Sequence, residues 1–207
     1  MTTGDIDAIA RLLLAGKPVI IPTDTVCGLA ILAAPGASPE ILFQIKQRPP
    51  EKSIPLLVSR HDDLSRHAVE LPDWALLMAA RHWPGALTLV CKAGAAVPPG
   101  FVADDGSIAL RMPGHTLVLE LLSRLPAPLA CTSANISGQP AVSRIELLDP
   151  LIIGQVAGVL DDAGYEPGRG VPASESALPS TIVSCLGAEP LILRQGALTL
   201  DLSLYKN

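Results

Sequence analysis

The amino-acid sequence predicts a mixed α/β fold in a single domain that spans residues 1–207. The chain has 207 residues, of which 49% are apolar and only 17% are charged, so it can bury a large core. Its 20 prolines and 17 glycines favour short elements joined by many turns, which excludes a bundle of long helices. Apolar β-branched runs and helical patterns follow one another without strict alternation, which favours a mixed sheet over a regular doubly wound one.

Four segments have the apolar spacing and the end signals of helices. Residues 5–15 place apolar side chains on one helical face, and Gly16 ends the pattern. Ser38 as the cap and Pro39 in the first turn begin a second helix, which ends before Pro49 because the residue before a proline disfavours helical geometry. We expect helices over residues 5–15, 38–47, 72–82 and 115–124.

Short runs rich in valine, isoleucine and leucine predict the strands, starting with KPVIIP at residues 17–22. Residues 164–179 form the longest stretch without periodicity, and such a loop in a compact domain is often functional. No internal repeat and no linker divides the chain. We expect strands over residues 17–22, 54–58, 86–91, 107–112, 129–131, 158–161, 181–185 and 191–194.

The composition argues against a protein that stacks nucleic-acid bases or covers a broad stretch of phosphate backbone. Aromatic residues make up only 3% of the chain, and 20 acidic residues outnumber 15 basic ones, for a net charge of −5. The net charge does not exclude a local basic pocket, because it does not describe where the charges lie.

The cysteines are widely spaced, and each lies in an apolar or strand-like run without a CxxC motif. We interpret Cys27, Cys91, Cys131 and Cys185 as reduced core residues of a cytoplasmic protein. The first residues lack a basic region followed by an apolar run, so no signal peptide is expected. No apolar run approaches the roughly 18 residues of a membrane span, so no contact with a membrane is expected.

Two clusters of polar residues could carry chemistry, although each also has an ordinary structural explanation. Lys46, Arg48 and Lys52 lie at a helix end, where they are either a solvated last turn or an anion site. The segment TSANISG at residues 132–138 follows an apolar strand, and its small polar side chains are either a capped turn or ligand contacts. A serine nucleophile is not expected there, because the pattern is not Gly-x-Ser-x-Gly.

Arg111 lies in an apolar strand and needs an anionic partner if it is buried. That partner is either an internal carboxylate or the carboxylate of a ligand. The histidines have no metal-binding spacing. We therefore expect surface or capping positions, rather than metal ligation, for His61, His67, His82 and His115.

Seven short motifs follow one another between about residues 4 and 197. They are PTDTVCGL at 22–29, KQRP at 46–49, PGALTLV at 84–90, ALRMPGH at 109–115, TSANISGQP at 132–140, STIV at 180–183 and ILRQGAL at 192–198. In this order they resemble the YrdC-like family of threonylcarbamoyl-AMP synthases, in its short, single-domain TsaC/YrdC form. The family's Lys-x-Arg and Ser-x-Asn pairs correspond to Lys46, Arg48, Ser133 and Asn135, which the resemblance implies are the catalytic residues.

The resemblance implies a twisted, open mixed sheet of the YrdC/RibB-like type around a large, positively lined cavity. It also implies an enzyme, a nucleotidyltransferase that condenses L-threonine, bicarbonate and ATP into threonylcarbamoyl-AMP and releases pyrophosphate. The product would serve the formation of N6-threonylcarbamoyladenosine at position 37 of tRNA, with a tRNA threonylcarbamoyl transferase complex as the downstream partner. Mg²⁺ is expected on the phosphates of ATP, without a protein ligand that can be named.

The resemblance further implies which side chains bind the substrates. Guanidinium groups suit phosphate and carboxylate oxygens, because they offer two parallel N–H donors. We expect ATP contacts from Arg48, Lys52, Ser133 and Arg194, and threonine contacts from Thr25, Arg111 and Ser180.

The chain departs from the family pattern at two places, and other functions stay open. Cys27 stands where the family usually has tyrosine, and the histidine that often follows the Lys-x-Arg segment has no clear counterpart, since Ser59 and His61 are only near it. The alternatives are a module that binds double-stranded RNA or tRNA by shape, and a divergent paralogue with the same fold and another reaction. Residues 164–179 are expected to act as a mobile lid over the labile adenylate.

Overall fold

The structure of the protein is a computed structural model that describes residues 1–47, 54–163 and 178–205. Its strands are β1 (Thr2–Thr3), β2 (Val19–Ile21), β3 (Gly28–Leu32), β4 (Leu56–Leu57), β5 (Ala68–Val69), β6 (Leu87–Ala93), β7 (Ser107–Arg111), β8 (Leu129–Ser133), β9 (Gly158–Leu160), β10 (Thr181–Ser184) and β11 (Leu191–Arg194). Its α-helices are α1 (Ile6–Leu14), α2 (Glu40–Ile45), α3 (Asp63–His67), α4 (Asp73–His82), α5 (Thr116–Ser123) and α6 (Pro150–Ile153). None of the helices in these described ranges is long and apolar enough to cross a bilayer.

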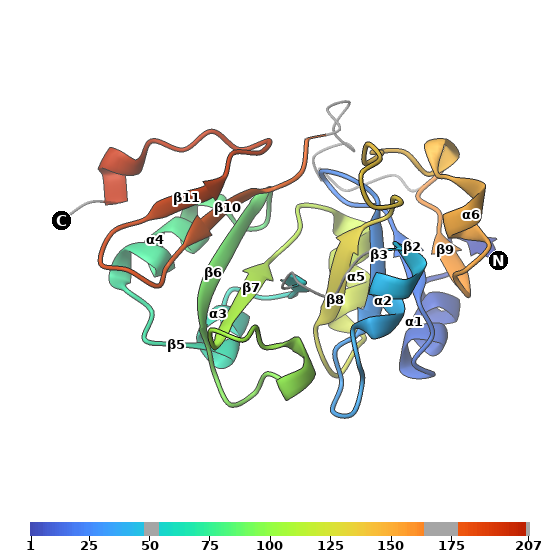
Figure 1. Cartoon of the computed structure of the whole chain (residues 1–207), viewed down its shortest axis with the longest axis horizontal. Helices are drawn as coiled ribbons and strands as arrows, with labels where there is room; N and C mark the ends of the chain where they lie inside the picture. Colours follow the sequence, from blue (N-terminus) through green and yellow to red (C-terminus); the bar gives the residue numbers. More distant parts are fainter. Residues whose placement is uncertain (48–53, 164–177, 206–207) are drawn as a thin grey trace.

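The described strands pair into one mixed sheet in the order β1-β9-β2-β3-β8-β4-β7-β6-β10-β11, with β5 paired to β6 beside this path (Figure 1). β9 is parallel to β1 and β2, whereas β3 is antiparallel to both β2 and β8. The short strand β4 is parallel to β7 and antiparallel to β8, so it joins the two halves of the sheet. The prediction of a mixed α/β fold without regular alternation is therefore confirmed.

The first helix shows how local signals determine the ends of an element. The Asp5 carboxylate accepts hydrogen bonds from two amides of the first turn, at 2.9 and 3.1 Å, and so caps α1. Gly16, at φ +71°, lets the chain leave the helix in a conformation that other residues rarely adopt. Ile9 and Leu13 are fully buried on the inner face, as the apolar spacing predicts.

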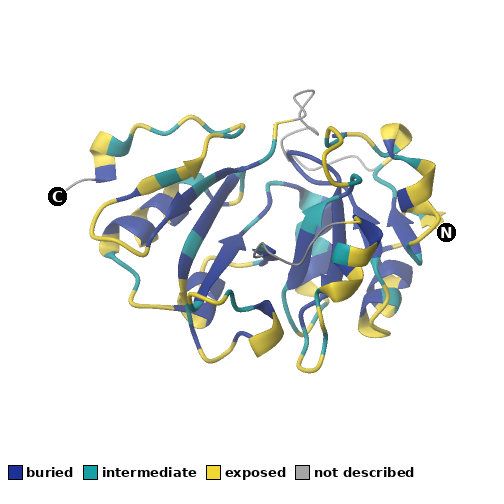
Figure 2. Cartoon of the chain, viewed as in Figure 1, coloured by how far each residue is buried: buried dark blue, intermediate teal, exposed yellow. Residues whose placement is uncertain are grey.

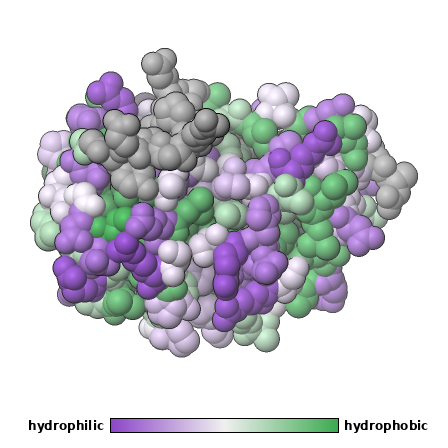
Figure 3. Space-filling view, turned by 180° about the vertical axis from the view of Figure 1, so that it is seen from behind, coloured by the Kyte–Doolittle hydropathy of each residue, from purple (hydrophilic) through white to green (hydrophobic). Residues whose placement is uncertain are grey.

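Apolar side chains cover both faces of the central strands, because successive residues in a strand point to opposite faces. In β2, Ile20 lies in one buried cluster, and its neighbours Val19 and Ile21 lie in the other. α1 and α5 complete the second cluster, while α2 and α4 contribute to the first. Figure 2 shows the buried strands between helices whose outer faces are exposed. On the back of the molecule, hydrophilic and hydrophobic side chains are interspersed (Figure 3).

Several short elements differ from the sequence predictions. No strand is predicted for β3, whose sequence GLAIL has few β-branched residues, yet it lies at the centre of the sheet between β2 and β8. The elements β1, α3, β5 and α6 are also absent from the predictions, because two to five residues carry little periodicity. The second helix is shorter than expected, and Pro39 rather than Ser38 occupies its cap position.

All four cysteines are free and buried, as the sequence predicts. Burial, followed by the charges of Asp162 and Glu146, raises the pKa of Cys27 to about 12. Burial also raises the pKa of Cys131 to about 12. Both thiols therefore stay protonated near neutral pH, which makes them inert core residues and not thiolate nucleophiles.

Gly28 in β3 tests how tightly the sheet is packed. A Cβ atom at this position would clash with Sγ of Cys131 on the neighbouring β8. We expect Gly28→Ala to lower the free energy of unfolding by about 1–3 kcal/mol in urea denaturation, because overpacking strains a close-packed core. Gly4→Ala is the matched control, since its Cβ would meet the Asp161 carbonyl oxygen at an ordinary 3.5 Å. Equal stabilities of the two variants would contradict this packing.

Candidate functional site

The Lys46 ammonium group joins two motifs that lie far apart in the sequence. Lys46 follows α2, whereas Ser133 ends β8 and Asn135 lies in the loop beyond it. The Nζ atom donates to the carbonyl oxygens of Ser133 and Asn135 at 2.5 and 2.7 Å, and it lies 3.3 and 3.1 Å from their side-chain oxygens. Lys46 is only 3% exposed, so these oxygens replace the water that a buried ammonium group loses.

The loop after β8 also holds itself in one shape. The Asn135 side-chain amide donates to the Gln139 carbonyl oxygen at 2.6 Å. Gly138 has φ +85°, a left-handed conformation that glycine adopts without steric cost. Lys46, Ser133 and Asn135 thus form one hydrogen-bonded unit, which we call the lysine bracket.

The Arg111 guanidinium is buried and makes three hydrogen bonds within the protein. Nη2 pairs with Asp24 Oδ1 at 2.6 Å, Nη1 donates to Thr25 Oγ1 at 2.9 Å, and Nε donates to the Gly85 carbonyl oxygen at 3.0 Å. The sequence leaves open whether Arg111 pairs with an internal carboxylate or with the carboxylate of a ligand. In the structure, it pairs with the internal carboxylate of Asp24. If the turn that carries Asp24 and Thr25 moved away, the buried charge of Arg111 would lose its partner, which costs free energy. The Arg111–Asp24 ion pair therefore holds this turn in place.

The Thr25 hydroxyl is fully buried, and its neighbours determine its orientation. Thr23 Oγ1 donates to the Val26 carbonyl oxygen at 2.7 Å, which uses the one proton of that hydroxyl. In the 3.0 Å contact between the two hydroxyls, Thr25 is therefore the donor. The Thr25 hydroxyl donates to Thr23 and accepts from Arg111, so it holds the guanidinium in place.

Ser180 and Arg194 form a second hydrogen-bonded group. Nε and Nη2 of Arg194 donate to the Ser180 carbonyl oxygen at 3.1 and 2.8 Å, and Nη2 lies 3.2 Å from the Ser180 hydroxyl oxygen. That hydroxyl is also 2.8 Å from Thr88 Oγ1. Gly196 lets the segment after β11 approach the segment before β10, because a Cβ atom at residue 196 would clash with the Pro179 carbonyl oxygen.

Electrostatic effects connect these groups into one region. Burial, and then the positive charge of Arg111, lower the pKa of Arg194. The charges of Arg111 and Lys46 both act on the Cys131 thiol, where they oppose the effect of burial on its pKa. Arginine stays protonated at neutral pH even so, which makes this region suited to an anion.

The structure thus brings the seven described site residues into three hydrogen-bonded groups, and the charges of Arg111 and Lys46 act across these groups. Arg48 and Lys52 lie outside the described residues. Asp24 is a site residue that the sequence analysis does not single out, although it lies inside the first motif and next to Thr25. A carboxylate in a motif after an apolar strand is the signal that could have identified it. The described residues in this region are Asp24, Thr25, Lys46, Arg111, Ser133, Asn135, Ser180 and Arg194.

Histidines and acidic residues do not form a metal centre in the described part of the chain. There, no three histidine, cysteine, aspartate or glutamate side chains gather as metal ligands would. His115 does occupy the cap position of α5, and its Nε2 lies 3.2 Å from Asp162 Oδ2. His67, in contrast, is buried within α3 instead of lying on the surface, which corrects the expectation for this residue.

Comparison with known proteins relates this geometry to one family. A family model described as telomere recombination, which covers Sua5, YciO and YrdC proteins, matches residues 11–196. The chain is 36% identical over 197 residues to the threonylcarbamoyl-AMP synthase of Bacillus subtilis, and 32% identical over 186 residues to that of Pyrococcus abyssi. These alignments cover 92% and 90% of this chain but 53% and 52% of the relatives, so the chain spans about half the length of these curated relatives.

The fold is similar to that of the Sua5 protein of Pyrococcus abyssi, whose crystal structure contains L-threonine. The TM-score is 0.80 at 29% identity, over 93% of this chain and 54% of the other. The match to the family model extends across the sheet, from within the helix before β2 to just beyond the end of β11. The chain therefore belongs to the Sua5/YciO/YrdC family, as its seven motifs predict.

Proposed function

We propose that this chain is an L-threonylcarbamoyladenylate synthase, which condenses L-threonine, bicarbonate and ATP and releases pyrophosphate. The lysine bracket carries the proposal, because it joins Lys46 of the Lys-x-Arg pair to both members of the Ser-x-Asn pair. Relatives named threonylcarbamoyl-AMP synthase, at 31–36% identity, support it, as does a relative whose crystal structure contains L-threonine.

The proposed reaction needs charge and geometry more than a nucleophilic side chain. The threonine amine attacks the carbon of bicarbonate, loses a proton and, with release of water, becomes a carbamate. A carbamate oxygen then attacks the α-phosphorus of ATP, and the bond from that phosphorus to pyrophosphate breaks. Catalysis of such a step comes mainly from positioning and electrostatic stabilisation, which agrees with a region rich in cations and hydrogen-bond donors.

Arg111 is proposed to bind the carboxylate of threonine while Asp24 and Thr25 hold it in place. A guanidinium has five N–H donors, and three of them are engaged within the described residues, which leaves two for a carboxylate. The proton of the Thr25 hydroxyl goes to Thr23, and one of its two lone pairs accepts from Arg111. Because its only proton is used within the protein, we propose that Thr25 acts chiefly through Arg111. Ser180 is proposed to contact threonine as well.

The phosphates of ATP are proposed to lie near Arg194, with Arg48 and Lys52 as further contacts. Arg194 is held by Ser180 and lies in the field of Arg111, so it offers a positioned positive charge. Ser133 is proposed to donate its hydroxyl proton to a phosphate oxygen. Lys46 and Asn135 are proposed to contribute chiefly by holding the loop that presents Ser133.

Mg²⁺ is proposed to arrive with ATP and not to have a site of its own on the protein. The described residues offer no cluster of three potential ligands, and the Asp24 carboxylate is committed to Arg111. The tRNA, the downstream transferase complex and a cytoplasmic location remain predictions. The proposed lid falls mostly on residues 164–177, outside the described residues.

Pyrophosphate release tests the proposed function. We expect the purified chain with ATP and Mg²⁺ to release pyrophosphate only when L-threonine and bicarbonate are both present, measured by a coupled phosphate assay. Omitting either co-substrate is the control for simple ATP hydrolysis. Bound ATP without any release would overturn the synthase proposal, and a tRNA titration at increasing salt would then test the RNA-binding alternative.

Thr25→Val tests whether the hydroxyl positions Arg111. Valine has the shape of threonine but leaves Nη1 of Arg111 without its acceptor, so we expect the KM for threonine to rise about tenfold or more. The free energy of unfolding should fall by about 1–3 kcal/mol. Thr25→Ser keeps the hydroxyl and should behave like the native protein. An unchanged KM in Thr25→Val would remove Thr25 from the threonine site.

Lys46→Ala tests the lysine bracket. The oxygens of Ser133 and Asn135 lose a buried donor, so we expect both the loss of turnover and a fall of about 1–3 kcal/mol in the free energy of unfolding. Lys17→Ala removes an exposed lysine and is the matched control. Loss of turnover with unchanged stability would show that Lys46 acts on the substrates and does not support the loop.

A further inference from the structure

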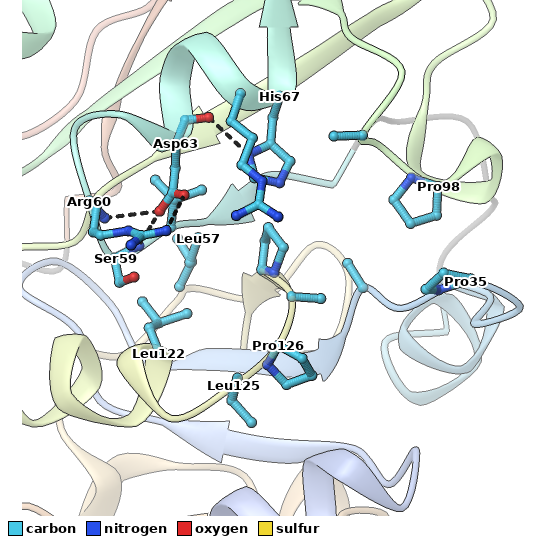
Figure 4. Close-up of a pocket in the computed structure, with 16 residues that line it drawn as sticks. Pro35, Leu57, Ser59, Arg60, Asp63, His67, Pro98, Leu122, Leu125 and Pro126 are labelled. Carbon is cyan, nitrogen blue, oxygen red and sulfur yellow. Dashed lines mark hydrogen bonds and ion pairs between the residues drawn. The ribbon is translucent and has the colours of Figure 1, made fainter.

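Figure 4 shows a pocket whose lining includes none of the described residues of the proposed synthase site. Its volume is about 270 Å³, and none of the described residues proposed to bind threonine or ATP lines it. Its walls come from the segments after β3 and β6, from the end of β4 through α3, and from the end of α5 and its connection to β8. Since the lining is different, this pocket needs its own explanation.

One part of the pocket wall is rigid and apolar. Figure 4 shows Pro35 and Pro98 on one side, with Leu125 and Pro126 on another. Proline has a fixed φ and leucine has no polar atoms, so these residues offer a preformed surface to an apolar molecule. Leu57 of β4 adds a fully apolar contact at the base.

The other part of the wall carries two arginines and one aspartate. The Asp63 carboxylate accepts hydrogen bonds from the amides of Ser59 and Arg60, at 3.2 and 3.0 Å, and lies 3.8 Å from the Arg60 guanidinium. The negative charge of Asp63 is therefore balanced by these groups at the start of α3. Arg66 also lines the pocket, and its guanidinium has no hydrogen bond or ion pair with any residue in the described ranges. The pocket thus carries one uncompensated guanidinium.

His67 adds a polar side chain to the lining of the pocket. Its Nδ1 lies 2.8 Å from the Asp63 carbonyl oxygen, and a carbonyl can only accept, so Nδ1 carries a proton. The second ring nitrogen, Nε2, is then the atom that can accept a hydrogen bond. His67 is 6% exposed, so this arrangement is built into the wall and is not a loose surface side chain.

We propose that this pocket binds a small organic anion, a single-ring molecule that carries one carboxylate or phosphate group. The apolar wall would take the ring, and Arg66 would take the oxyanion through two parallel N–H donors. The volume of about 270 Å³ lies just below the usual range of about 300–1,000 Å³ for drug-sized ligands, which fits one ring and not a nucleotide triphosphate. The proposal does not depend on the synthase activity.

Ligand titration with the full chain tests this proposal. The probes are benzoate and phenyl phosphate as ring anions, phenol as the neutral ring, and inorganic phosphate as the anion without a ring. Amide shifts of residues 57–67, 122–125 and 127 in ¹H–¹⁵N spectra report the binding. We expect saturable shifts with at least one ring anion, and weaker binding of both phenol and inorganic phosphate.

Arg66→Gln should weaken the binding of that ring anion about tenfold or more, because it removes the charge and keeps most of the side-chain length. Arg144→Gln is the matched control, since Arg144 is an exposed arginine outside the pocket. Absence of saturable shifts up to about 10 mM probe would overturn the proposal. Equal binding of phenol and benzoate, or equal weakening by the two substitutions, would also overturn it. Pyrophosphate release by Arg66→Gln should match the native rate, which separates this site from the synthase site.

Discussion

The cost of removing a cation from water is the constraint on which the candidate site depends. An ammonium or guanidinium group can be buried only when protein oxygens replace its hydration shell. Lys46 meets this condition with oxygens from Ser133 and Asn135, which forces the segment after β8 to fold back onto the end of α2. The loop therefore has its shape because the Lys46 charge needs oxygen partners, and the same contacts place small polar side chains at the carboxyl end of β8.

Arg111 meets the same condition in a different way, with a carboxylate, a hydroxyl and a carbonyl oxygen. These partners come from two turns, one after β2 and one before β6, so a single side chain holds three segments together. There is little space beside this pair, since a Cβ atom at Gly114 would lie 3.1 Å from Asp24 Oδ2. The arginine is thus held rigidly before any ligand arrives, and preorganised donors lose less entropy on binding.

The sequence predicts the parts of this architecture that depend on local pattern. Apolar spacing over many residues predicts α1 well, because a long helix accumulates a strong periodic signal. The central strand β3 is missed, because its strand character comes from pairing with β2 and β8 and not from its own five residues. Similarly, Arg111 is expected to need an anion, but its partner is one of 20 acidic residues, and only the fold selects Asp24. The meeting of Lys46 with Ser133 spans 87 positions of sequence, so only the family motifs indicate it in advance.

The relation between Arg111 and Arg194 explains why the region favours an anion. Burial is the main reason why the pKa of Arg194 is lowered, and repulsion by the positive charge of Arg111 lowers it further. Asp24 compensates the charge of Arg111, whereas Arg194 is held by the neutral carbonyl and hydroxyl oxygens of Ser180. Neutral oxygens keep Arg194 in position without cancelling its charge. A bound phosphate or carboxylate would supply the missing negative charge and relieve the repulsion, so the free energy of the unliganded region already favours the ligand class that the proposed reaction requires.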